Sequence, residues 1–291
     1  MSEYYINPQL VGRRFSQAVS TYDEHAVLQR EVGRRLIKHI EFTRLKPEWI
    51  LDIGCGTGYF TGLLRQRFKR AHIIAMDMAT AMSSAAKKKY IRRFPWQAKT
   101  QFATADALAL PFSDARFDLV CSNLTMQWVT EPQRMLAEMR RVLAPGGLML
   151  LSTFGRRTLA ELRQSLASIK HEYAGLVLPF PDVTSLGNCL MELPVELPVT
   201  DTDLFTLTYP DAMALVRELK AWGASSSALP NRPGGLYGRG LLRQLNAAYN
   251  TAHQIEGGRT RATFEVLYAQ AWHAEAPHTY DNVIPIEVES E

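Results

Sequence analysis

Ile50-Leu51-Asp52-Ile53-Gly54-Cys55-Gly56-Thr57-Gly58 carries the clearest structural signal in this chain. An apolar run broken by one acid leads into three glycines at alternate positions, a pattern typical of a buried strand, a tight turn and a helix. A turn without side chains allows a ligand to lie against the backbone. The spacing is not the Gly-x-Gly-x-x-Gly of dinucleotide sites. Tyr59-Phe60 follows the last glycine, so the Gly-Lys-Ser/Thr of a P-loop is also absent.

Segments with the apolar spacing of strands and of helices alternate on both sides of this turn. We predict strands over residues 49–53, 72–76, 100–103, 117–122 and 148–154, and helices over 11–45, 58–68, 79–92 and 131–143. Further along, we predict helices over 158–168, 211–222 and 241–249, and strands over 204–209 and 262–272. This order predicts an α/β fold with a doubly wound, mostly parallel seven-stranded sheet, N-terminal helices and a helical insertion on the substrate side. The last two strands are expected to be an antiparallel pair.

The length of 291 residues fits one large domain with added helices. We divide it into an N-terminal helical cap (1–45), a cofactor-binding core (46–154), substrate-side helices with the last strands of the sheet (155–273), and a flexible tail (274–291). A polar loop rich in glycine and proline over 225–238 is long enough to face a substrate.

Composition and charge exclude several functional classes. The formal net charge of +4 is too small to indicate nucleic-acid binding, and it is compatible with an acidic protein partner. The three cysteines are widely spaced and show no metal-ligand pattern. We therefore expect no metal site. No apolar window approaches the length of a membrane span, so we expect a cytoplasmic protein without a membrane contact.

Polar residues end four of the predicted strands: Asp52, Asp77, Asp106 and Asn123. In a parallel sheet the carboxyl ends of the strands meet at the edge where ligands bind. Asp77 is placed to accept hydrogen bonds from both hydroxyls of a ribose, and Asp106 to receive an adenine amine. Asp52 before the glycines would oppose a pyrophosphate but suits the cationic S-adenosylmethionine. The alternative for each acid is a helix N-cap.

Several segments of the sequence resemble those of the seven-stranded, S-adenosylmethionine-dependent methyltransferases. The resemblance rests on 51–58, on 106–112 with 117–120, and on the Leu-Ala-Pro-Gly-Gly run at 143–147. Shorter matches over 14–30, 122–128, 207–210, 219–224 and 263–266 are similar to the malonyl-acyl carrier protein O-methyltransferases of biotin synthesis. The candidate cofactor-binding residues are Tyr22, His25, Asp52, Gly54, Cys55, Gly56, Gly58, Asp77, Met78, Asp106, Ala107, Asn123 and Leu124.

The resemblance implies methylation of the free carboxylate of a malonyl thioester, carried by an acidic acyl carrier protein or by CoA. A carboxylate is ionised at pH 7 and needs no general base, so we expect no catalytic residue and only positioning. Arg156 and Arg157 are the candidates for holding the carboxylate, and Trp128 for a wall of the substrate pocket. The alternatives are two arginines at the start of an exposed helix and a core tryptophan.

Other functions remain open at this stage. The same fold serves methyltransferases for other small acids or quinone-like acceptors, and assembly factors that use the cofactor pocket differently. A non-catalytic S-adenosylmethionine sensor is a further alternative, although the extended second half favours an enclosed substrate.

Overall fold

The computed structural model describes residues 6–41, 43–90, 99–223 and 238–274. Most of the predicted polar loop and all but the first residue of the predicted tail lie outside these residues. Within the described part of the chain, no helix has both the length and the apolar character needed to cross a membrane.

A seven-stranded sheet forms the centre of the molecule, with the strand order β3-β2-β1-β4-β5-β7-β6. Strands β1 to β5 are parallel, and β7 runs antiparallel to both β5 and β6. The direction in which the strand order grows reverses between β1 and β4, so a ligand crevice is expected at their carboxyl ends. The strands are β1 Trp49–Ile53, β2 His72–Asp77, β3 Thr100–Thr104, β4 Phe117–Asn123, β5 Leu143–Phe154, β6 Glu196–Tyr209 and β7 Thr260–Trp272. The predicted fold class is confirmed.

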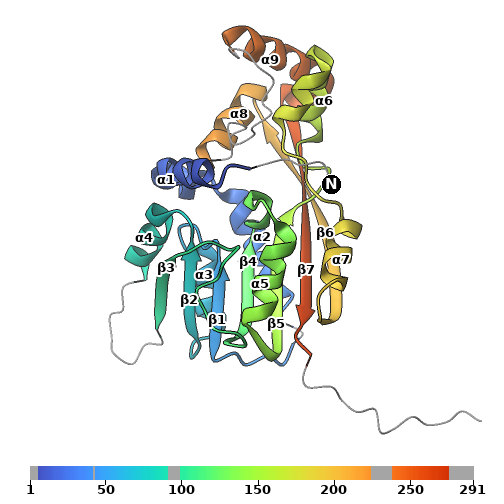
Figure 1. Cartoon of the computed structure of the whole chain (residues 1–291). Helices are drawn as coiled ribbons and strands as arrows, with labels where there is room; N and C mark the ends of the chain where they lie inside the picture. The colour runs from blue at the N-terminus through green and yellow to red at the C-terminus, as the bar shows by residue number, and fades with distance from the viewer. Residues whose placement is uncertain (1–5, 42, 91–98, 224–237, 275–291) are drawn as a thin grey trace, which may run out of the picture.

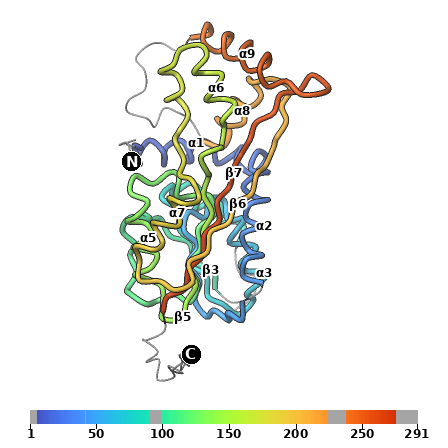
Figure 2. Tube along the Cα trace, turned by 90° about the vertical axis from the view of Figure 1, so that its right-hand side faces the viewer, coloured from blue at the N-terminus to red at the C-terminus, as the bar shows by residue number. Residues whose placement is uncertain are grey.

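Helices cover both faces of this sheet because successive residues of each buried strand point to opposite sides. Ile50 packs into one core with α2 and α3, whereas Leu51 packs into a second core with α5 and α7. Figure 2 shows the two layers on opposite sides of the sheet. The helices are α1 Pro8–His25, α2 Val27–Lys38, α3 Tyr59–Arg67, α4 Thr80–Lys89, α5 Pro132–Val142, α6 Ala160–Ile169, α7 Val183–Met191, α8 Ala212–Ala221 and α9 Arg239–His253.

Some predicted boundaries were wrong. The helical stretch predicted over 11–45 is two helices that meet at Ala26, and the second ends at Lys38. Helix α7 was missed because prolines surround it, although the Asp182 side chain accepts a hydrogen bond from the Ser185 N–H at 2.8 Å, an N-cap that the sequence could have shown. Strand β5 begins at Leu143, before its predicted start at residue 148, because Leu143 pairs with Phe117.

Strand β6 begins eight residues before its predicted start, whereas β7 exceeds its prediction by only two residues. They pair from Glu196 and Trp272 to Tyr209 and Thr260, whereas β5 stops pairing with β7 at Val266. The outer half of this ribbon therefore rises beyond the sheet and supports α6, α8 and α9, while α1 crosses the carboxyl edge below them (Figure 1). Pro198 is tolerated in β6 because it lies on the edge of the sheet, at an irregularity in the register between Glu196 and Val199. This arrangement places a helical lobe above the expected crevice.

Candidate functional site

The glycine turn after β1 is held in a conformation that favours glycine. Gly54, Gly56 and Gly58 have φ angles of +72°, +53° and +88°. The N–H groups of Gly54 and Cys55 both donate to the carbonyl oxygen of Met76, at 2.8 and 2.9 Å, which joins the turn to the end of β2. The turn therefore presents bare backbone at the switch point of the sheet.

Asp77 at the end of β2 braces this turn. Its Oδ2 accepts from the Gly56 N–H at 2.9 Å, and its Oδ1 accepts from the Ala79 N–H at 2.8 Å. Each carboxylate oxygen has two lone pairs, so both keep acceptor capacity for the two hydroxyls of a ribose. Burial raises the pKa of Asp77, and the two N–H donors partly oppose that rise.

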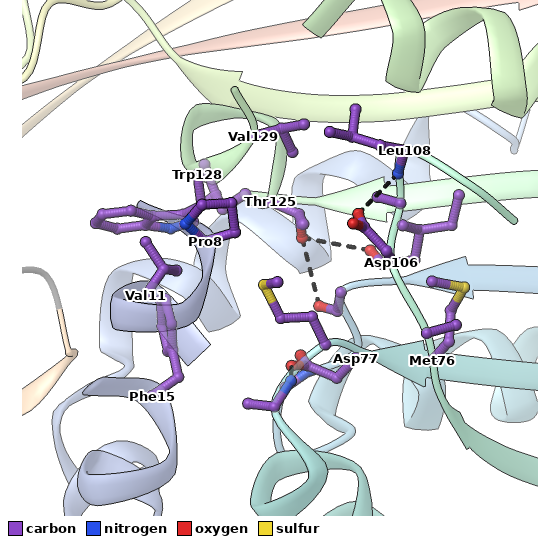
Figure 3. Close-up of a pocket in the computed structure, with 18 of the residues that line it drawn as sticks. Pro8, Val11, Phe15, Met76, Asp77, Asp106, Leu108, Thr125, Trp128 and Val129 are labelled. Atoms are coloured by element: carbon purple, nitrogen blue, oxygen red, sulfur yellow. Dashed lines mark hydrogen bonds between the residues drawn. The ribbon is translucent and has the colours of Figure 1, made fainter. Parts of the chain in front are cut away.

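A cavity of about 800 Å³ opens between α1 and the carboxyl ends of β1, β2 and β4. Figure 3 shows Val11 and Phe15 of α1 on one side, with Asp77 and Asp106 on the other. Nine of the predicted cofactor-binding residues line it: Tyr22, Gly54, Gly56, Asp77, Met78, Asp106, Ala107, Asn123 and Leu124.

Helix α1 closes this cavity and is fastened to the glycine turn. The side chain of Asp23 accepts a hydrogen bond from the Thr57 hydroxyl and forms an ion pair with Lys89 of α4 at 2.5 Å. About two turns earlier on α1, Phe15 packs edge to face on Tyr22. Burial, followed by the charge of Asp77, raises the pKa of the Tyr22 phenol, so the hydroxyl stays protonated and able to donate.

Four predicted residues do not line the cavity. Cys55 and Gly58 belong to the far side of the turn, where Gly58 packs under Tyr90 and its carbonyl oxygen accepts from the Tyr90 hydroxyl at 2.8 Å. His25 offers its carbonyl oxygen to the Trp222 indole at 2.8 Å, which ties α1 to the end of α8. These three residues support the cavity from behind, so a direct role in cofactor binding remains a prediction.

Asp52 is the fourth of these residues, and it lies buried beneath the turn. Its Oδ2 accepts from the Thr61 hydroxyl at 2.6 Å, while its Oδ1 is buried without a hydrogen-bond partner among the described residues. Burial raises the pKa of Asp52 to about 7. A cationic ligand above the turn would favour the ionised form of this carboxylate. The carboxylates of Asp52 and Asp77 around the turn therefore fit S-adenosylmethionine, which carries a sulfonium and an ammonium group, better than a dinucleotide.

Asn123 and Leu124 line the cavity with their backbone. The Asn123 side chain points away, because its Nδ2 donates to the Gln29 carbonyl oxygen at 3.2 Å and its Oδ1 accepts from the Ser152 hydroxyl at 2.9 Å. Leu124 has a φ of +50°, and its N–H donates to Ser152 at 3.1 Å. Sequence reasoning missed Val11, Phe15 and Thr125, which line the same cavity but carry no distinctive pattern.

Two further hollows adjoin the cofactor cavity. The second hollow, of about 1310 Å³, lies between α6, α8, α9 and β7 and shares Trp128 with the cofactor cavity. The third hollow, of about 1570 Å³, shares Val129 and Thr130 with it. The three spaces thus meet around Trp128–Thr130, after β4. Both new hollows are large enough for an acceptor.

The two candidate arginines lie in different places. Arg156 lines the third hollow together with Gln127, Thr153 and Asp182. Arg157 lines a separate hollow beside Glu161 and Arg261, which shares no lining residue with the cofactor cavity. Both side chains are exposed. Of the pair, the geometry brings only Arg156 next to the cofactor cavity.

The strand order, the glycine turn at the switch point and the acid on β2 define an S-adenosylmethionine-dependent methyltransferase of the seven-stranded class. A family model described as "Methyltransferase domain" matches residues 51–151. Among solved structures, a methyltransferase from Bacillus halodurans matches with a TM-score of 0.58, 17% identity, and coverage of 83% of this chain and 99% of that one. A phosphoethanolamine N-methyltransferase 2 from Haemonchus contortus, in complex with S-adenosyl-L-methionine, matches with a TM-score of 0.54, 16% identity, and coverage of 89% and 57%.

The relatives in sequence narrow this class. A protein of Halorhodospira halophila is 41% identical over 92% of this chain and 88% of its own length. One of Xylella fastidiosa is 39% identical over 94% and 90%. Both are malonyl-(acyl-carrier protein) O-methyltransferases, and this chain belongs to that family.

Proposed function

We propose that this enzyme transfers a methyl group from S-adenosylmethionine to the free carboxylate of a malonyl thioester, an early step of biotin synthesis. The observation that carries the proposal is the near full-length similarity to malonyl-(acyl-carrier protein) O-methyltransferases, which includes the helices of the second half. The cavity around Asp77 and the two hollows beside it agree with a cofactor and an acceptor that meet at Trp128.

S-adenosylmethionine supplies an electrophilic methyl group when it is bound. We assign the ribose hydroxyls to Asp77, the adenine side to Asp106 and Ala107, and the methionine end to the backbone of Gly54, Gly56 and Leu124. Tyr22 and Met78 complete the walls. These groups bind and orient, and α1 excludes water from above.

The acceptor brings its own nucleophile. A carboxylate is ionised at neutral pH, so no side chain has to remove a proton. Bound S-adenosylmethionine would supply the methyl group and the carboxylate would supply the electron pair, so no proton would have to move. A site of this kind needs positioning groups and no catalytic base.

We keep Arg156 and Trp128 as substrate-binding residues. Arg156 lines the third hollow with amide and hydroxyl side chains, a mixed polar surface that suits the amide-containing arm of a thioester. Trp128 lies where the cofactor cavity and the second hollow meet. Arg157 was predicted for the same role, but it lines the separate hollow and serves best as the control for Arg156.

An acidic carrier protein is the proposed partner. Arg13 and Arg14 on α1 and Arg239 and Arg243 on α9 flank the lobe above the hollows, and three of these four side chains are exposed. On α4, by contrast, Lys89 is already paired with Asp23. The residues of α1 and α9 are therefore the better docking candidates.

A methylation assay tests this function. The protein is mixed with S-adenosylmethionine and, in parallel, with malonyl-carrier protein, malonyl-CoA and free dicarboxylic acids, and the mass gain is measured. We expect one methyl group on a malonyl thioester. Methylation of a free acid alone would mean that the enzyme acts on another class of acceptor. Binding of S-adenosylmethionine without any product would identify a non-catalytic protein.

A further inference from the structure

We propose that the second hollow, between α6, α8, α9 and β7, is the acceptor site in which Lys220 holds the substrate carboxylate. This inference rests on the proposed function and deepens it. Lys220 would be a positioning residue, since it carries no reacting atom.

The wall of this hollow is almost wholly apolar. Leu162, Leu219, Leu245 and Phe264 are typical of its lining, and Lys220 is the one charged residue among the described lining residues. The polar exceptions are occupied: the Thr158 hydroxyl bonds the backbone of Glu265 at 2.8 Å, and the Trp222 indole N–H donates to His25. Among the described residues, an anion that enters the hollow therefore meets a single charge, that of Lys220.

A chain of contacts places the end of α8 next to the cofactor cavity. Trp222, two residues after Lys220, is buried and hydrogen-bonded to α1 at 2.8 Å. A Cβ at Gly223 would lie 3.3 Å from the ring of Phe15. Phe15 in turn packs edge to face on Trp128, with ring centroids 5.4 Å apart. Trp128 and Phe15 both line the cofactor cavity. Lys220 therefore lies at the end of a helix that contacts α1, the helix that closes the cofactor cavity.

The surroundings of Lys220 and Arg156 differ in charge. Arg156 shares its hollow with Asp182. The backbone N–H and the hydroxyl of Ser185 lower the pKa of the Asp182 carboxyl, and the charge of Arg156 adds to this effect. No acid lines the second hollow among the described residues. Glu218, the nearest acid on α8, accepts from the Tyr209 hydroxyl at 3.0 Å and is not part of the lining. No acid among the described lining residues therefore competes with a substrate carboxylate for Lys220, whose side chain is exposed.

An ammonium group also suits the reaction better than a guanidinium. A guanidinium binds both carboxylate oxygens at once and would weaken the nucleophile. An ammonium group is a point charge that one oxygen satisfies, which leaves the other free to attack the methyl group. After transfer the ester is neutral and loses its attraction to Lys220. The same residue would thus bind the acid and favour release of the product.

The test compares Lys220→Met with Arg217→Met, an exposed residue of α8 that does not line the hollow. For Lys220→Met we expect KM for the malonyl thioester to rise about 10- to 100-fold, the range for loss of one charged hydrogen bond. Affinity for S-adenosylmethionine and the melting temperature should stay unchanged. Lys220→Arg should restore binding but not the full kcat. Arg217→Met should behave like the wild type.

A binding measurement separates this inference from the proposed function. Calorimetry with malonyl thioester and its methyl ester, in the presence of S-adenosylhomocysteine, requires no turnover. The wild type should prefer the acid by about tenfold or more, and Lys220→Met should lose that preference. An unchanged preference in Lys220→Met, or loss of cofactor affinity in that variant, would overturn the role of Lys220. Failure of the wild type to bind either thioester would instead overturn the proposed function.

Discussion

Gly54 in the cofactor turn lies directly against Thr125, the second residue after β4. The Thr125 hydroxyl is 3.4 Å from the Gly54 carbonyl oxygen and 3.3 Å from that of Ile53. A Cβ on Gly54 would overlap the hydroxyl and lie 2.5 Å from Cγ2 of Thr125. The Gly54 backbone thus lies so close to the Thr125 side chain that a Cβ has no room, which explains a glycine at this position better than φ alone.

This contact predicts different results for two glycines of the same turn. Gly54→Ala adds a clash to the cost of a left-handed residue, so we expect a loss of well over 2 kcal/mol in the free energy of unfolding. Gly56→Ala meets nothing closer than the Tyr22 ring at 3.8 Å and should cost only about 1–2 kcal/mol. Its methyl group enters the cavity, however, so cofactor affinity should fall. Chemical denaturation and calorimetry measure both effects; equal stability of the two variants would contradict the packing argument.

Replacing Asp77 should weaken the cofactor site. Asp77→Ala removes the predicted ribose acceptor and two hydrogen bonds to the backbone of Gly56 and Ala79. We expect affinity for S-adenosylmethionine to fall by about 1–3 kcal/mol or more. Asp106→Ala, at the proposed adenine side, should lower the affinity less, because Asp106 is exposed and its side chain accepts from the Leu108 N–H at 2.9 Å in its own turn. An unchanged calorimetric affinity in Asp77→Ala would refute the ribose assignment.

The buried carboxyl of Asp52 should make stability depend on pH. Burial raises its pKa to about 7, above the value in an unfolded chain. Between about pH 4 and pH 7 the folded state therefore holds the extra proton, and the free energy of unfolding falls as pH rises through this window. The contribution is on the order of 2–4 kcal/mol. Asp52→Asn, a neutral isostere, should remove most of this slope; Asp77, whose pKa is also raised by burial, would account for the remainder.

The contacts of Asp23 predict a role in closing α1 over the cofactor. Asp23→Ala removes the bond to Thr57 and the exposed ion pair with Lys89, so the stability of the whole protein should change by less than about 1 kcal/mol. Cofactor affinity should nevertheless fall several-fold, because α1 loses its fastening to the turn. Glu24→Ala, a change at an exposed neighbour, is the control. Equal affinity in the two variants would show that the other contacts of α1, including the bond from Trp222 to His25, hold it over the cofactor.

The two candidate arginines should separate in kinetics. Arg156→Ala should raise KM for the malonyl thioester by about tenfold and leave cofactor affinity intact, because Arg156 lines the third hollow. Arg157→Ala should change neither value, since Arg157 lines the separate hollow. A reversed result would place the acceptor on the opposite side of β7.

The cofactor half of the site could be predicted from sequence because its signals are local. Apolar spacing and glycine punctuation locate β1 and the turn, and an acid at the end of β2 necessarily lies beside that turn in a parallel sheet. Asp52 shows the limit of this reasoning, since its side chain turns beneath the glycines to Thr61. Sequence position alone does not tell which side of the turn a carboxylate occupies.

The acceptor half depended on contacts between distant segments. Arg156 and Arg157 are neighbours in sequence, yet the chain sends their side chains into different hollows. Lys220 reaches its hollow because Trp222 joins α8 to α1 across 197 positions of sequence. The fold class and the cofactor follow from the amino-acid sequence, since strand period, turn chemistry and strand-end acids act over short distances. Which cations line the hollows beside the cofactor cavity can be seen only in the folded chain, because that depends on how α1, α8 and the long β6–β7 ribbon pack together.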